Sequence, residues 1–220
     1  MRLAIGDIHG RNFWKHYFDE DFSAYYMLGD YFDSYNLPFD VQYRNFIEIC
    51  DAAKADSRIK LCLGNHDYHY LGNIGFQRYS GYQKSNARRI RHILETNITL
   101  LQIVHVTEDR FILSHAGVSR RFMDKLGLGR IEEINEGFTV NREILSFDGN
   151  DIYGDNITQS PLWIRPRSLL KDCVCGYSQI VGHTQCASIT EVPLQTRDAD
   201  DNPKKLVFID TGEVESIYRF

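Results

Sequence analysis

The sequence predicts a mixed α/β fold in which helices cover the faces of β-sheets, and two observations carry this prediction. Short apolar runs alternate with longer stretches of mixed apolar and charged spacing through the first half of the chain, which is the order of elements that produces a sheet flanked by helices. The chain has 220 residues, of which 43% are hydrophobic, which is enough for one sizeable core and short for two. We therefore expect a single domain over residues 1–220.

The first half of the chain contains three strand-like runs, at residues 1–5, 24–28 and 59–63, and each leads into a glycine followed by a polar residue. This pattern is typical of buried strands that end at a turn. Residues 12–21 and 39–55 have the spacing of helices, and residues 83–95 predict a third helix. That helix carries arginines at positions 88, 89 and 91, which we interpret as a solvated face rather than a nucleic-acid patch.

The second half is richer in β-structure. Residues 99–106 and 110–113 flank a turn-like segment and predict a hairpin. Residues 130–145 predict a helix, whereas residues 146–160 are rich in Asp, Asn and Gly and predict a loop that can serve as a lid, a partner surface or a connection. The closing strands are predicted at residues 177–181, 188–192, 205–209 and 214–218, with an acidic turn region at 195–203.

Charge and hydropathy exclude several classes of protein. The chain has 25 Lys and Arg against 30 Asp and Glu, a formal charge of −5, which argues against a long nucleic-acid partner. No apolar run approaches the roughly 18 residues that cross a bilayer, and the first ten residues lack the features of a signal peptide. We therefore expect a cytoplasmic protein without a membrane partner, and we leave its oligomeric state open.

The five cysteines are an odd number, which fits reduced thiols better than a disulfide framework. Cys173 and Cys175 have the spacing of half a metal site, but Cys186 does not complete it. We interpret these three as small buried hydrophobic residues.

Five short motifs share one design, in which a strand-like run stops at a small residue and then presents a side chain that can bind a metal or carry a proton. They are GDIHG at 6–10, GDYFD at 29–33, GNHD at 64–67, SHAG at 114–117 and GHT at 182–184. In open α/β sheets, ligands bind beyond the carboxyl ends of the strands. We therefore expect these motifs to converge on one pocket.

The candidate side chains at these positions are three Asp (Asp7, Asp30 and Asp33), one Asn and up to four His, with no thiolate. Oxygen and imidazole ligands suit Mn, Fe, Zn or a similar divalent ion and disfavour a cysteine zinc site. Two ions roughly 3.5–4 Å apart bind a water as hydroxide and neutralise charge on a phosphoryl group. The predicted reaction is phosphoester hydrolysis by direct attack, with Asp30 placed to bridge the two ions.

In this order, the motifs resemble the signature of the calcineurin-like metallophosphoesterases, most closely the phosphoprotein (serine/threonine) phosphatase branch with its bacterial and phage relatives. They run from Gly6 to Thr184, and five in order at strand ends are far more specific than any one of them. The resemblance implies a four-layer sandwich of two central mixed β-sheets flanked by helices. It also implies two divalent ions, with Mn expected first and Fe, Zn, Ni or Co as alternatives.

The resemblance also implies a role for each motif residue. Asp7 and His9 would bind the first metal, Asp30 would bridge the two, and Asn65, His115 and His183 would bind the second. His66 would be the general acid for the leaving group, with Asp33 fixing its tautomer and raising its proton affinity. Asp67 would be a supporting residue. The remaining histidines, including His69, are interpreted as ordinary; the others are His16, His92 and His105.

One position departs from the family pattern. The family reads GDxxDRG with a phosphate-binding arginine, whereas this chain has Ser34 in that place. Arg165, within a Trp-x-Arg stretch that resembles bacterial relatives, is the first candidate to replace it, because an arginine can bind phosphate oxygens through two hydrogen bonds. Arg167 is the second candidate, and Arg11 is a third because it directly follows the first motif.

Several substrates stay open at this point. The main hypothesis is a phosphomonoesterase acting on phosphorylated proteins, as a serine/threonine or dual-specificity protein phosphatase, or on small phosphoesters. A dinucleoside tetraphosphate hydrolase is the nearest alternative, because aromatic residues after GNHD can stack on bases or can equally pack a cap over the core; they are Tyr68, Tyr70, Phe76, Tyr79 and Tyr82. Nuclease or cyclic phosphodiesterase activity, and a silent binding module suggested by Ser34, are lesser alternatives.

Overall fold

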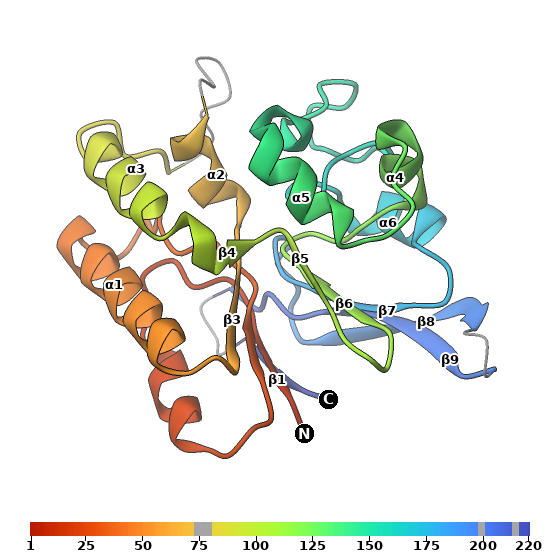
Figure 1. The fold of residues 1–220 in the computed structure, drawn as a ribbon, viewed down its shortest axis with the longest axis horizontal. Helices are drawn as coiled ribbons and strands as arrows, with labels where there is room; N and C mark the ends of the chain where they lie inside the picture. The colour runs from red at the N-terminus through yellow and green to blue at the C-terminus, as the bar shows by residue number, and fades with distance from the viewer. Residues whose placement is uncertain (73–80, 198–200, 213–215) are drawn as a thin grey trace.

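Two five-stranded β-sheets form the centre of the protein, and helices cover their outer faces (Figure 1). The structure is a computed structural model, and it describes residues 1–72, 81–197, 201–212 and 216–220. The predicted arrangement of two mixed sheets flanked by helices is confirmed.

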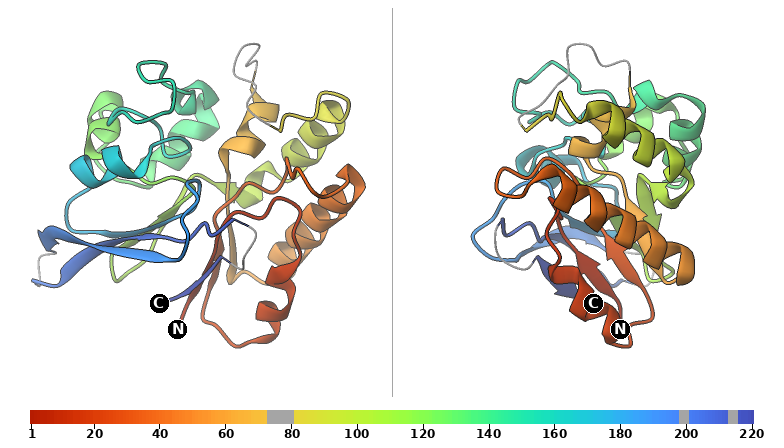
Figure 2. Two further views of the ribbon diagram at one scale, coloured as in Figure 1. Left: turned by 180° about the vertical axis from the view of Figure 1, so that it is seen from behind. Right: turned by 90° about the vertical axis from the view of Figure 1, so that its left-hand side faces the viewer.

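The first sheet has the strand order β10-β1-β2-β3-β4. Strands β1 to β4 run parallel to one another, and the edge strand β10 pairs antiparallel with β1. The strands are β1 (Leu3–Ile5), β2 (Tyr25–Met27), β3 (Ile59–Cys62), β4 (Leu101–Gln102) and β10 (Ile217–Arg219). The antiparallel pairing of the first and last strands brings the two chain termini side by side (Figure 2).

The second sheet has the order β5-β6-β7-β9-β8, with a parallel centre and an antiparallel strand at each edge. Its strands are β5 (Val104–Val106), β6 (Phe111–Ser114), β7 (Ser178–Val181), β8 (Thr190–Arg197) and β9 (Pro203–Phe208). The parallel strands of both sheets end near the same edge of the molecule, which is what brings the motifs together.

The helices divide between the sheets. Helices α1 (Phe39–Ala55) and α3 (Ala87–Thr96) pack on the first sheet, and α4 (Arg120–Leu126), α5 (Glu133–Val140) and α6 (Pro166–Asp172) lie over the second (Figure 1). A short helix, α2 (Asn65–Leu71), starts directly after β3. Three 3-10 helices complete the set: η1 (Phe13–Asp19), η2 (Ile98–Leu100) and η3 (Arg142–Leu145).

Alternation along the strands builds the core. Side chains such as Ala4 and Leu28 of the first sheet meet Leu113, Ile180 and Val207 of the second in one buried cluster. Their neighbours along each strand point the opposite way, toward the helices. Because successive side chains of a strand face opposite sides, nearly every residue of these short strands is buried.

The predicted hairpin at 99–113 is only partly correct. The strand predicted at 99–106 divides in two: Leu101 pairs with β3 in the first sheet, and β5 pairs with β6 in the second. At the crossing, the backbone amides of Ile103 and Val104 donate to Oδ1 of Asn135 at 2.8 and 3.1 Å. The side chain from α5 therefore replaces the ladder bonds that the chain gives up as it changes sheets.

Other boundaries also differ from the prediction. The helix predicted at 130–145 breaks at Asn141, whose backbone is extended and whose side chain accepts from the amide of Glu143. Helices α2, α4 and α6 were not predicted. Strand β8 continues to Arg197, into the predicted acidic turn, whereas residues 198–200 and 213–215, the latter including the start of the strand predicted at 214–218, lie outside the described residues.

The predicted loop at 146–160 contains no helix or strand. Hydrogen bonds within it include one from the Thr158 hydroxyl to Asp148 Oδ2 at 2.6 Å and one from the Asp148 amide to Gln159 Oε1 at 2.8 Å. Its role as a lid stays a prediction. Among the described residues, no helix combines the length and apolar character needed to span a bilayer.

Replacing Ile180 by Ala tests the contact between the sheets. Ile180 is fully buried in that cluster, so the change should lower the free energy of unfolding by about 2–5 kcal/mol through lost burial and a residual cavity. Chemical denaturation measures this. Ile152→Ala is the control, because Ile152 is 79% exposed and its loss should change stability by less than about 0.5 kcal/mol. Equal effects would contradict this description of the core.

Candidate active site

The five motifs lie together where parallel strands of the two sheets end. Asp7, Asp30 and Asn65 follow β1, β2 and β3, while His115 and His183 follow β6 and β7. One ligand atom each from Asp7, Asp30 and His115 lies within 4.8 Å of the others. The predicted convergence on one site is therefore observed.

On one side of this site, His9 faces Asp30. Its Nδ1 donates to the carbonyl of Phe32 at 2.6 Å, and its Nε2 lies 3.8 Å from Asp30 Oδ2. The bond to Phe32 fixes the tautomer, so that the lone pair of Nε2 is directed at the space beside Asp30. Asp30 Oδ1 accepts from the amide of His66 at 2.9 Å, which leaves Oδ2 for the site.

On the other side, Asn65, His115 and His183 meet closely. Nε2 of His115 lies 2.7 Å from Asn65 Oδ1, 3.2 Å from His183 Nδ1 and 3.5 Å from Asp30 Oδ2. His183 Nδ1 lies 3.0 Å from the same Asn65 oxygen. His115 Nδ1 donates to the carbonyl of Leu28 at 2.9 Å, so its Nε2 presents a lone pair. Two acceptor atoms, His115 Nε2 and Asn65 Oδ1, therefore face each other beside His183.

This donor set fits a divalent cation. Acceptor atoms that converge without a hydrogen between them repel one another, and a cation in the middle converts that repulsion into ligation. The ligands are carboxylate, amide oxygen and imidazole, which suit first-row divalent ions. Hydrogen bonds from His9 and His115 to backbone carbonyls are the kind of outer contact that orients a metal-binding imidazole.

Burial acts on the protonation of every ligand. It raises the pKa of Asp7 and of Asp30 well above the usual range, and each also feels the charge of neighbouring carboxylates. Burial also lowers the pKa of His9 to about 4 and that of His115 to about 3, and it lowers the pKa of His183 strongly. The imidazoles are therefore neutral, which is the form that binds metals.

The backbone is unusual at these positions. His9, Asp30, Asp33 and His183 all have positive φ, at 44°, 53°, 65° and 64°. Non-glycine residues rarely adopt this conformation, and it concentrates at functional sites. Gly64 allows the close approach of two motifs, because a Cβ there would lie 2.1 Å from Oδ1 and 2.2 Å from the backbone nitrogen of Asp30.

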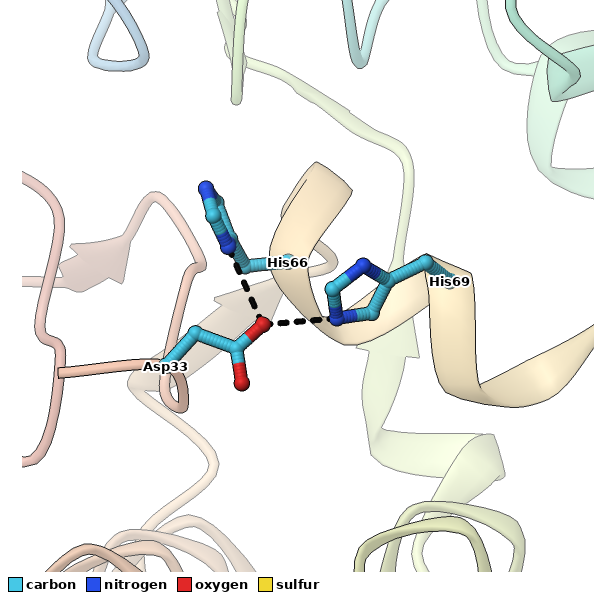
Figure 3. A group of neighbouring side chains, drawn as sticks. All are labelled: Asp33, His66 and His69. Atoms are coloured by element: carbon cyan, nitrogen blue, oxygen red, sulfur yellow. Dashed lines mark hydrogen bonds and ion pairs between the residues drawn. The ribbon is translucent and has the colours of Figure 1, made fainter. Parts of the chain in front are cut away.

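A second cluster lies beside the first, and it centres on Asp33 (Figure 3). Asp33 Oδ2 lies 3.1 Å from His66 Nδ1 and 2.6 Å from His69 Nε2. Asp33 Oδ1 accepts from the Tyr70 hydroxyl and from Gln83 Nε2. The edge of the His66 ring approaches His9, with ring centroids 5.3 Å apart, so this cluster adjoins the cation site.

The pairing of His66 with Asp33 was predicted from the sequence, but the contacts of His69 and Tyr70 were missed. The interpretation of His69 as an ordinary histidine is wrong, because its imidazole contacts the same carboxylate oxygen as that of His66. Residues 66 and 69 are spaced i, i+3, so they share one face of a helix. That signal was present in GNHDYH, but it required the prediction of helix α2.

Asp67 joins two motifs. Its Oδ1 accepts from the amide of Tyr31 at 2.9 Å and its Oδ2 accepts from the amide of Gly64 at 3.0 Å. Burial raises the pKa of Asp67 to about 7. The side chain thereby ties the second motif to the third, in agreement with its predicted supporting position.

The three candidate arginines lie in different surroundings. Arg165 donates from Nε to the carbonyl of Tyr153 at 2.9 Å and from Nη1 to the Thr184 hydroxyl at 3.0 Å, directly beside His183. Arg167 is largely exposed and lies 3.9 Å from Asp155. Arg11 donates to the backbone carbonyls of Asp7, Ile8 and Gly212.

Ser34, which stands where the family has its arginine, completes a turn before α1. Its hydroxyl accepts from the amides of Asn36 and Leu37 at 3.3 and 3.2 Å. Its own amide donates to Gln42 Oε1 at 3.2 Å. The serine therefore stabilises the backbone between β2 and α1.

The aromatic residues after GNHD pack inside the protein. Tyr68 is buried and donates to the carbonyl of Arg142 at 2.8 Å, and Tyr70 stacks on Tyr82 with ring centroids 4.9 Å apart. The packing alternative is therefore correct for these three residues, while Phe76 and Tyr79 lie outside the described residues.

The cysteines are reduced, as predicted, because all five are free. The prediction of burial is wrong for Cys175, which is exposed, whereas Cys173 and Cys186 are half-buried. Cys173 follows the C-terminal end of α6, and Cys186 follows the GHT motif at 182–184. In both places the chain turns near the surface, which leaves the side chains partly exposed.

Comparison with known proteins agrees with the geometry. The model of the calcineurin-like phosphoesterase family matches residues 2–183. This chain belongs to that family. No curated protein matches the sequence. As a calcineurin-like phosphoesterase, the protein is a metal-dependent phosphoric ester hydrolase with two candidate metal-binding clusters.

Two solved structures of cold-active protein tyrosine phosphatases show the same fold. The chain is similar to a cold-active protein-tyrosine phosphatase of a psychrophilic Shewanella species, at 15% identity and a TM-score of 0.60, over 96% of this chain and 71% of that one. Another structure of a cold-active protein tyrosine phosphatase matches at 15% identity and a TM-score of 0.56, over 96% and 69%. A Saccharomyces cerevisiae serine/threonine phosphatase matches at 11% identity and a TM-score of 0.46, over 97% and 82%.

Replacing Gly64 by Ala tests the close approach of β3 to Asp30. The new methyl group would overlap the Asp30 carboxylate and its backbone nitrogen, so metal uptake should fall by at least about tenfold, as it does when groups that orient metal ligands are lost. Equilibrium dialysis with Mn followed by elemental analysis measures this. Gly129→Ala is the control, because no atom lies within 4 Å of its added Cβ. Normal Mn binding by the Gly64 variant would contradict the prediction.

Proposed function

We propose that this calcineurin-like phosphoesterase is a binuclear metal-dependent phosphatase that hydrolyses phosphomonoesters, with phosphoserine and phosphothreonine in proteins as its main substrates. The observation that supports this most strongly is the convergence of acceptor atoms on both sides of Asp30, beside the Asp33–His66 pair. A phosphatase needs both parts, one to hold charge on the phosphoryl group and one to protonate the leaving group.

The proposed ligands divide around Asp30. Asp7 and His9 would hold one ion, Asn65, His115 and His183 would hold the other, and Asp30 would contribute to both. When bound, such a pair of ions supplies an activated water and neutralises charge on the phosphoryl oxygens. We propose Mn as the ion to test first, because oxygen and imidazole ligands of this kind suit it.

His66 is the proposed general acid. Because Nδ1 donates to Asp33, the opposite ring nitrogen, Nε2, can carry the proton that passes to the leaving alkoxide. The position of the ring near His9 places this proton next to the cation site. Asp33 holds the ring in orientation.

Arg165 is the proposed phosphate ligand that replaces the family arginine. Its Nη1 donates to the hydroxyl of Thr184, the residue after His183. The negative charges of Asp7 and Asp30 favour the charged form of its guanidinium group. Arg11 donates to the backbone carbonyls of Asp7 and Ile8 in the first motif and to that of Gly212, which suits a supporting position. Arg167 points toward Asp155 at the surface.

Access for a substrate is available beside the site. A cavity of about 160 Å³ is lined by His9, Asp33 and Tyr35, among others, and Tyr35 is 74% exposed. An open approach of this kind suits a residue on a polypeptide. The dinucleoside tetraphosphate alternative loses the support of Tyr68 and Tyr70, because both are buried.

Product analysis tests the proposed substrate. Metal-free protein is incubated with and without Mn against a phosphoserine peptide and a dinucleoside tetraphosphate, with Asp30→Asn as the inactive control. We expect Mn-dependent release of inorganic phosphate from the peptide. Nucleoside diphosphates from the tetraphosphate, with no phosphate from the peptide, would overturn the substrate assignment.

Replacing His66 by Asn tests the acid role. Turnover of an alkyl phosphate should fall about 100-fold or more, whereas turnover of nitrophenyl phosphate, whose leaving group needs little protonation, should fall less than about tenfold. Steady-state rates on the two substrates measure the difference. Equal losses on both would show that His66 does not protonate the leaving group.

Replacing Arg165 by Ala tests the phosphate contact. Loss of a charge-assisted bond to the phosphoryl oxygens should lower kcat/KM about 10- to 100-fold. Arg167→Ala is the matched control from the same segment and should stay within about twofold of the unmodified enzyme. If the control lost as much activity as the Arg165 variant, the assignment of the phosphate ligand would be wrong.

A further inference from the structure

The Asp33 carboxylate has more close polar neighbours than the pairing with His66 requires, and one of them is the imidazole of His69, whose Nε2 lies 2.6 Å from Oδ2. We infer that His69 is a positioning residue, which holds Asp33 in the orientation that keeps the His66 ring directed at the leaving group. The inference rests on the proposed acid role of His66 and extends it to a residue outside the five motifs.

The contacts around Asp33 occupy both of its oxygens. Oδ2 lies 2.6 Å from His69 Nε2 and 3.1 Å from His66 Nδ1 (Figure 3). Oδ1 accepts from the Tyr70 hydroxyl and, at 3.3 Å, from Gln83 Nε2. The carboxylate is 1% exposed, so water does not compete for these positions and each lost bond leaves a buried acceptor.

The chemistry of the groups around Asp33 favours a hydrogen-bonded cluster over a third metal site. A hydroxyl and an amide group already donate to Oδ1 of the carboxylate. The tautomers are also compatible, because each imidazole can donate one N–H to the carboxylate. The cation site differs in this respect, since two acceptor atoms, His115 Nε2 and Asn65 Oδ1, face each other there.

Helix α2 explains why one oxygen meets both rings. Residues 66 and 69 lie one helical turn apart and project from the same face, which Figure 3 shows directed at Asp33. The His69 side chain is completely buried, and its ring packs edge-on against Tyr70 and Tyr82 with centroids 4.4 and 5.0 Å away. His69 is therefore fixed by its own packing, whereas the His66 side chain is 17% exposed.

The most rigidly held side chain of the three is His69, so we infer that it orients Asp33, which in turn orients His66. His69 holds Oδ2 from the interior, Asp33 is held in turn in a left-handed backbone conformation, and His66 at the surface of the site takes its orientation from Oδ2. If His69 cannot donate, one bond to a buried carboxylate is lost and the carboxylate can rotate away from His66. The rate should then fall only for substrates whose leaving group must be protonated by His66.

A matched pair of substitutions tests the inference. Gln and Met have similar size and shape, but only Gln can donate a hydrogen bond to Asp33. In the holoenzyme, His69→Met should lower kcat for an alkyl phosphate about tenfold or more and change kcat for nitrophenyl phosphate less than about twofold, with KM unchanged for both. His69→Gln should restore the alkyl rate to within about threefold of the unmodified enzyme.

A double-mutant cycle locates the effect. If His69 acts through Asp33, then His69→Met should change nothing further in an Asp33→Asn background. An additional loss there would overturn the inference. So would a Met variant with the normal ratio of alkyl to nitrophenyl rates, or equal losses on both substrates in the Met and Gln variants. Thermal unfolding and Mn content of every variant are measured alongside.

Tyr70→Phe provides a comparison on the same carboxylate, because it removes a donor from Oδ1, the oxygen that does not contact His66. Its effect on the alkyl rate should be smaller than that of His69→Met, and a larger effect would overturn the special position of His69. The outcome also separates two hypotheses. A normal substrate ratio in His66→Asn would contradict the acid role itself, whereas a changed ratio there with a normal one in His69→Met would contradict this inference alone.

Discussion

The convergence of buried acceptor atoms around Asp30 is the constraint on which the rest of the structure depends. Asp7 and Asp30 are each only 2% exposed, and His115 is fully buried. Carboxylates and neutral imidazoles at such short range destabilise the folded chain unless a positive charge joins them. The fold therefore holds a site whose electrostatic cost is relieved by cations, and the same cations are what phosphoester hydrolysis requires.

Holding these atoms together requires rigid surroundings. The strands are short, but their alternate faces fill both the contact between the sheets and the contact with the helices. His9, Asp30, Asp33 and His183 lie in turns with positive φ. Backbone amides contribute as well: His183 donates to the Asp7 carboxylate at 3.0 Å and His66 donates to Asp30 at 2.9 Å. Two of the carboxylates are thus held by the backbone of another motif.

The Asp33 cluster shows how a second layer supports the first. The His66–Asp33 pair adjoins the cation site, and behind it His69, Tyr70 and Gln83 surround the carboxylate. Gln83 also donates to Gln42 Oε1 at 3.1 Å, and Gln42 in turn accepts from the amide of Ser34. Ser34, at the position that lacks the family arginine, is therefore linked by hydrogen bonds to the Asp33 carboxylate.

The sequence by itself determined the elements that recur as local patterns. Apolar runs that end in a glycine and a polar residue identified β1, β2 and β3. The same kind of pattern predicted that the motif side chains meet, because parallel strands end on one edge of a sheet, whereas the six proposed ligands were chosen among them by the family resemblance. Helix α1 was predicted with its observed limits, since seventeen residues of consistent spacing leave little ambiguity.

Contacts between distant segments were decided only by the tertiary structure. Asn135 accepts two hydrogen bonds from the backbone where residues 101–106 pass from one sheet to the other. The local sequence at this crossing does not predict a partner about thirty residues away. The contacts of the three candidate arginines, which the sequence could only rank, are likewise set by distant segments. His69 faces Asp33 because it lies on helix α2, which has only seven residues. A helix of this length is too short to be predicted from the periodicity of the sequence. Side-chain partners depend on packing between segments that are distant in the sequence, whereas the end of a strand is a pattern of consecutive residues and can be predicted locally.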